Sequence, residues 1–79
     1  MPRLYQITVP GLDVRADWRT VHDRLLDDFP GVDDVLATTI GATILIVYEG
    51  PPQVDGWLES ISSSIAARQT AIGLRHQAS

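Results

Sequence analysis

Apolar residues fall at every second position at the start of the chain. Tyr5, Ile7 and Val9 share this spacing between residues 3 and 9. A period of two places the three side chains on one face of a β-strand. Pro10-Gly11 follows, and this pair is typical of a turn. The pattern predicts a first strand over residues 3–9.

The spacing then changes to steps of three and four residues. The apolar positions of this segment are Val14, Trp18, Val21, Leu25 and Phe29. Such steps align side chains along one stripe of an α-helix. Pro30-Gly31 follows directly, and both residues are typical helix breakers. The pattern predicts an amphipathic helix between residues 14 and 29.

Two segments rich in β-branched and apolar residues come next. They cover Val35–Ile40 and Thr43–Glu49, and Gly41-Ala42 separates them. This composition favours strands, and a short connection favours antiparallel pairing. The two segments predict a hairpin closed by a tight turn.

A second helix is predicted after Gly50-Pro51-Pro52, because a proline suits the first position of a helix. Apolar residues then recur at helical steps, at Val54, Trp57, Leu58, Ile61 and Ile65. The pattern predicts a helix over residues 54–65, and residues 66–68 could extend it by a turn.

A short final strand is expected near the C-terminus. Ile72, Leu74 and His76 alternate with Gly73 and Arg75 there, over residues 72–76. The order is then βαββα with a final β. Two helices on one face of an antiparallel sheet in this order predict an α+β domain, a ferredoxin-like two-layer sandwich. With 79 residues the chain forms one domain, residues 1–79.

The sheet face away from the helices is expected to be partly apolar. If Ile44, Ile46 and Tyr48 point toward the helices, Leu45 and Val47 point the other way. Leu4 joins them from the first strand. Leu36 and Ile40, from the strand before, complete the predicted interface. Apolar patches on small domains mark interfaces, so we expect a homodimer or a protein partner bound through this face or an adjacent edge strand.

Composition and charge exclude several classes of function. Ten acidic and six basic residues give a net charge of −4, which disfavours binding to nucleic acid. The absence of cysteine excludes disulfides and thiolate sites for metals or catalysis. No stretch approaches the roughly 18 apolar residues of a membrane span. We expect a cytoplasmic protein that does not bind membranes.

Three segments resemble the heavy-metal-associated domain. They are ITVPGL at residues 7–12, FPGVDDV at residues 29–35 and ILIVYE at residues 44–49. In that family a Gly-Met-Thr-Cys-x-x-Cys loop follows the first strand, and Gly-Val-x-x-Val opens the second. The resemblance covers about residues 4–65 and implies the same sandwich fold.

The metal loop of that family is not present. Its positions fall on residues 11–17, where Val14 and Asp17 stand in place of the two thiolates. Soft ions such as Cu(I) need sulfur ligands, so we expect no metal and no cofactor. Pro10-Gly11-Leu12 is also similar to the first turn of ACT domains, which sense small molecules. That likeness implies a ligand near this turn, at a dimer interface.

Other side chains that could carry chemistry lack the required arrangement. Asp17 and His22 are five residues apart and face different directions on a helix, which disfavours a shared metal ion. The acidic pairs at residues 27–28 and 33–34 lack the calcium-loop pattern. No serine stands in a nucleophile elbow. We therefore expect no enzyme. The prediction is a protein-interaction or self-assembling module; the alternative is an ACT-like regulatory domain that binds a small molecule.

Overall fold

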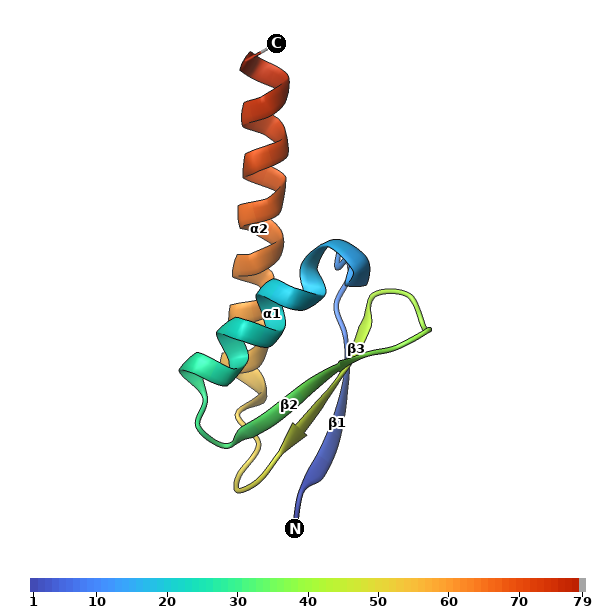
Figure 1. The fold of residues 1–79 in the computed structure, drawn as a ribbon, viewed down its shortest axis with the longest axis vertical. Coiled ribbons are helices and arrows are strands. Elements are labelled where there is room, and N and C mark those ends of the chain that lie inside the picture. The colour runs from blue at the N-terminus through green and yellow to red at the C-terminus, as the bar shows by residue number, and fades with distance from the viewer. Residues whose placement is uncertain (79) are drawn as a thin grey trace.

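The computed structural model describes the backbone of residues 1–78 and the side chains of residues 1–72. The elements in chain order are β1 (Arg3–Thr8), α1 (Val14–Asp28), β2 (Val32–Ala37), β3 (Thr43–Tyr48) and α2 (Val54–Ala78). The predicted α+β class is confirmed: a three-stranded antiparallel sheet packs with two helices (Figure 1).

The sheet has the strand order β1-β3-β2, so the apolar β3 lies in the centre. Ile46 is paired with Tyr5 of β1 and with Val35 of β2. Ile44 and Ile46 have no exposed surface and Tyr48 is buried, which confirms the prediction that these three face the helices. Because successive side chains alternate, Leu45 and Val47 point to the other face.

Both helices contribute side chains to one core. Val21 and Leu25 of α1 are completely buried, as is Ile61 of α2. Trp57 of α2 reaches the sheet, where its ring centre lies 5.0 Å from that of Tyr48. The side chains that the sequence placed on two apolar stripes therefore meet over one face of the sheet.

The second strand begins and ends three residues earlier than predicted: it spans Val32–Ala37 instead of residues 35–40. Pairing starts early because the turn after α1 is short, and Val32 N–H donates to the carbonyl of Phe29 at 2.9 Å. Val32 then packs as a buried core residue opposite Tyr48. The prediction of a tight turn between the two strands is also wrong, because residues 38–42 form a five-residue loop there.

The predicted final strand over residues 72–76 is wrong, because α2 continues as a helix to Ala78. Residues 66–71 (AARQTA) contain neither glycine nor proline and include strong helix formers, so nothing turns the chain back toward the sheet. The ferredoxin-like pattern is therefore not matched at its last element. The side chains of Leu74 and His76 lie outside the described residues.

The second half of α2 projects from the body of the domain (Figure 1). The whole molecule therefore measures 50 Å along its longest axis. Within the described part of the chain, no helix is both long and apolar enough to cross a bilayer.

Candidate interaction surface

The face of the sheet opposite the helices carries a row of apolar side chains, here called the open face. Leu4 is paired with Val47, and Leu36 with Leu45, so the four residues stand on adjacent strands. Leu4 is 65% exposed and Leu36 is 41% exposed, while Leu45 and Val47 are half-buried. No element of the described chain covers this face, which leaves its side chains available to another molecule.

Ile40 is exposed to 58%, but it lies outside the sheet. It belongs to the loop of residues 38–42, where its N–H donates to Thr38 Oγ1 at 3.2 Å. The Thr38 hydroxyl also lies 2.8 Å from the carbonyl oxygen of Thr43, so it ties the loop to the start of β3. Ile40 is thus presented by an anchored loop at one end of the sheet, and the strand position predicted for it is wrong.

The outer edge of β2 is occupied by groups from α1. Trp18 Nε1–H donates to the carbonyl of Val35 at 3.0 Å, and Val35 N–H donates to Asp34 Oδ1 at 2.8 Å. His22 Nε2 lies 3.3 Å from the same carboxylate oxygen, and its Nδ1 lies 3.0 Å from Asp23. His22 is therefore held between two carboxylates beside the sheet edge. Among the residues that the structure describes, no three such side chains are arranged so that they could hold a metal ion.

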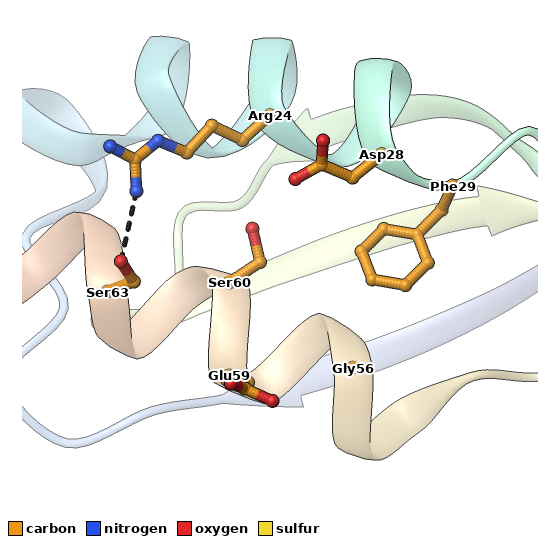
Figure 2. A pocket seen from close by; sticks show the side chains of 7 residues that line it. All are labelled: Arg24, Asp28, Phe29, Gly56, Glu59, Ser60 and Ser63. Carbon is orange, nitrogen blue, oxygen red and sulfur yellow. Dashed lines mark hydrogen bonds between the residues drawn. The ribbon is translucent and has the colours of Figure 1, made fainter.

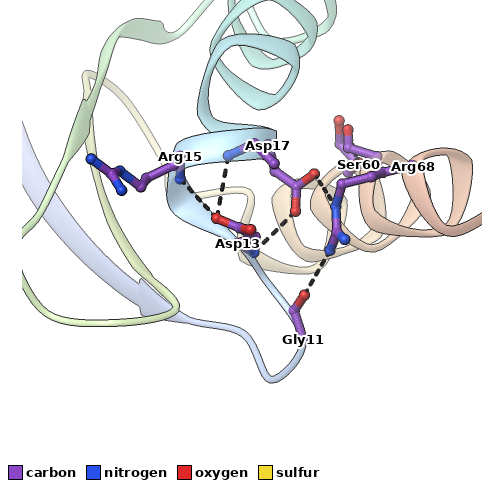
Figure 3. Close-up of polar contacts among 8 residues, drawn as sticks. Gly11, Asp13, Arg15, Asp17, Ser60 and Arg68 are labelled. Carbon is purple, nitrogen blue, oxygen red and sulfur yellow. Dashed lines mark hydrogen bonds and ion pairs between the residues drawn. The ribbon is translucent and has the colours of Figure 1, made fainter. Parts of the chain in front are cut away.

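An ion pair between a buried carboxylate and a partly exposed arginine closes the turn between β1 and α1 (Figure 3). Asp17 is only 2% exposed, and its Oδ1 accepts a hydrogen bond from Arg68 Nε at 2.7 Å. Arg68 Nη2 donates to the carbonyl of Gly11 at 3.0 Å, and Asp13 N–H donates to Asp17 Oδ2 at 3.1 Å. One arginine of α2 thus joins three parts of the molecule: the helix itself, the turn and the first residues of α1.

The hydrogen bond that Arg68 donates to Asp17 raises the pKa of Arg68 above its ordinary value, and the negative charges of Asp17 and Asp13 act in the same direction. Arg68 therefore stays charged wherever the protein is folded. Asp17 stands at the second thiolate position of the heavy-metal-associated loop, and here it is engaged by an internal cation. An ACT-like ligand was expected at the turn of residues 10–13. The Gly11 carbonyl of this turn is engaged by the same arginine, Arg68.

A groove separates the two helices on the outside of the molecule (Figure 2). It has a volume of about 500 Å³ and is lined by Arg24, Asp28, Phe29, Gly56, Glu59, Ser60 and Ser63. Arg24 Nη1 donates to Ser63 Oγ at 3.2 Å across it. Its lining is mainly polar: two serines, two carboxylates and one arginine surround it. The groove therefore offers polar contacts to a molecule that lies between the two helices.

Sequence reasoning missed the Asp17–Arg68 pair because the two residues are 51 positions apart. A signal was present: Asp17 stands on α1 beside Trp18 and four positions before Val21, within the apolar stripe. A carboxylate on the helix face that packs into the core requires a cation or a hydrogen-bond donor as its partner. The partner could not be identified, because the end of α2 was not predicted.

Comparison of the chain with models of protein families, with curated proteins and with solved structures finds no match. The likeness to the heavy-metal-associated domain therefore stays a prediction.

Proposed function

We propose that the domain is a non-enzymatic interaction module that associates with a protein surface, in the first instance a second copy of itself, through the open face or an edge strand. The observation that carries this proposal is the row formed by Leu4, Val47, Leu45 and Leu36, which is apolar and uncovered. Removing such side chains from water stabilises a complex by about 25 cal/mol per Å² of apolar surface.

The size of the domain supports association. A chain of 79 residues buries a single small core, and roughly 1.5 kcal/mol of conformational entropy opposes the ordering of each residue. The sheet packs on one face only, so half of its surface adds nothing to the core of the monomer. Burial of the open face in a complex would use that surface.

The proposal takes the fold to be a ferredoxin-like sandwich whose described residues form no final strand. The strand order β1-β3-β2 and the common core of the two helices support this assignment. The module is also taken to be cytoplasmic, which fractionation of the host cells would test.

An ACT-like regulatory domain is the other function predicted from the sequence. It would need open polar groups at the turn of residues 10–13. The Gly11 carbonyl and the Asp17 carboxylate are instead engaged by Arg68. This geometry favours the interaction module over the ligand-binding domain.

Size-exclusion chromatography with light scattering tests the proposal through two matched substitutions. Leu4→Lys places a charge on the open face at β1, and Leu58→Lys places the same charge on α2, where Leu58 is 36% exposed. We expect the unaltered chain and Leu58→Lys to elute above monomer mass at high concentration, and Leu4→Lys to elute as a monomer. Equal masses for all three proteins would contradict an interface at this face or edge.

A further inference from the structure

The two edges of the sheet differ in how they are protected. A sheet edge exposes unpaired backbone groups, and proteins protect such edges with bulges, charges or covering side chains. The edge at β2 has all three. Its pairing with β3 is irregular between Val32 and Asp34, Asp34 binds the N–H of Val35, and Trp18 covers the Val35 carbonyl. Another strand cannot add there without displacing these contacts.

Within the described residues the edge at β1 is protected only by one charge at its end. Its six residues pair with β3 in continuous register from Arg3 to Thr8, without a bulge. The strand contains no proline and a single charge, Arg3. Its outer side pairs with no strand of the described chain, because α2 continues as a helix where a last strand was predicted. The edge of β1 is therefore a template for a further strand.

We infer that the β1 edge pairs with β1 of a second copy, in antiparallel orientation about a two-fold axis, to give a continuous six-stranded sheet. This inference rests on the proposed function and names its partner and its surface.

The side chains of β1 suit pairing with their own copy. Two-fold antiparallel pairing keeps both open faces on the same side only if one residue of β1 lies opposite its own copy. Tyr5 and Gln6, in the middle of the strand, are the two choices that pair the most residues. With the axis at Tyr5, Leu4 lies opposite Gln6 of the second copy. With the axis at Gln6, Leu4 lies opposite Thr8. In both registers β1 of the second copy covers the half-buried Tyr5.

Charge also favours a second copy at this edge. The chain carries a net charge of −4, so two copies repel each other over most of their surface. The first acidic residue is Asp13, and β1 contains only Arg3 as a charged group, whereas β2 contains Asp33 and Asp34. A two-fold axis through the strand places the two Arg3 side chains at opposite ends of the seam. The copies therefore approach with the least repulsion at β1.

A single pair of six-residue strands makes a small interface, so the dimer should be weak, with a dissociation constant on the order of 10–100 μM.

Disulfide trapping tests this inference, because the chain has no cysteine of its own. Three oxidised samples report on the interface: Gln6→Cys alone, an equal mixture of Leu4→Cys and Gln6→Cys, and Leu36→Cys. The first reports the register centred on Gln6, and the second the register centred on Tyr5. The third reports stacking of one open face on another. Thr20→Cys, exposed on α1, gives the rate of random collision.

We expect one of the two β1 samples to form covalent dimer at least about tenfold faster than Thr20→Cys, because pairing raises the local thiol concentration. We expect Leu36→Cys to react at the rate of Thr20→Cys, and Leu36→Lys to leave the association of the chain unchanged. Circular dichroism checks that each variant folds; Gln6, Leu4, Leu36 and Thr20 are all exposed, so each should tolerate the change.

Three results would overturn the inference. If Leu36→Cys reacts fastest, the dimer uses the open face and the proposed function still stands. If the chain self-associates while neither β1 sample reacts above the collision rate, the dimer does not use the β1 edge. If the unaltered chain is monomeric at 200 μM and no sample exceeds the collision rate, self-association itself is wrong.

Discussion

At the scale of single residues, the Asp17–Arg68 pair holds the projecting helix to the rest of the domain. Arg68→Gln leaves the Asp17 carboxylate buried without its cation, and such a loss is strongly destabilising. We expect the melting temperature to fall by about 5 °C or more. Thermal unfolding followed by circular dichroism measures this change. Arg19→Gln, at an exposed arginine of α1, is the matched control and should leave the melting temperature unchanged.

The effect of Arg68 should not depend on pH in the usual range. Its pKa is raised above its ordinary value in the folded protein, so its contribution to stability is complete across the usual pH range and is lost only at strongly alkaline pH. The difference in melting temperature between the unaltered chain and Arg68→Gln should therefore be the same at pH 7 and pH 9. A difference that disappears at pH 9 would show that another group carries the interaction.

Two glycines offer a second comparison at this scale. A Cβ added to Gly31 would lie 2.8 Å from the carbonyl oxygen of Glu49, whereas a Cβ on Gly41 meets nothing within 4 Å. The Glu49 N–H also donates to the Gly31 carbonyl, so the two backbones cannot separate freely. We expect Gly31→Ala to lower the free energy of unfolding by about 1–3 kcal/mol. Gly41→Ala should change it by less than about 1 kcal/mol. Urea titration of both variants measures this, and equal losses would contradict the close approach.

At the scale of elements, α2 contributes to the core through one face only. Ile61 is completely buried, and Leu58, on the same predicted stripe, is 36% exposed. Ile61→Ala should therefore cost about 2–5 kcal/mol of unfolding free energy. Leu58→Ala should cost less than about 1 kcal/mol. Chemical denaturation checks both values, and a larger loss at Leu58 would mean that the helix is rotated about its axis.

The elements that the sequence predicted well are those with a clear period. Tyr5, Ile7, Ile44 and Ile46 alternate strictly, so the sequence indicated the inner and outer faces of β1 and β3 together. The same alternation placed Leu4, Leu45 and Val47 on the open face. The limits of β2 could not be predicted, because its bulge shifts the period between Val32 and Asp34. The end of α2 was missed because the apolar stripe stops at Ile65 while the helix continues on intrinsic propensity.

At the scale of the whole molecule, the distribution of charge separates the body from the end of α2. All ten acidic residues lie between Asp13 and Glu59, whereas the residues after Ile65 contain two arginines and no acid. Arg68 uses its charge inside the monomer. The acidic groups thus lie on the helices, on β2 and in the loops, and β1 is left free of them. In the proposed dimer this distribution favours contact at β1.

The central claim is that the chain associates with itself through β1. Analytical ultracentrifugation of the unaltered chain, diluted from 200 to 5 μM, tests this claim most directly. We predict that the weight-average mass falls with dilution toward the 8.7 kDa of one chain from a value approaching twice that mass. A mass of 8.7 kDa at every concentration would contradict self-association through β1.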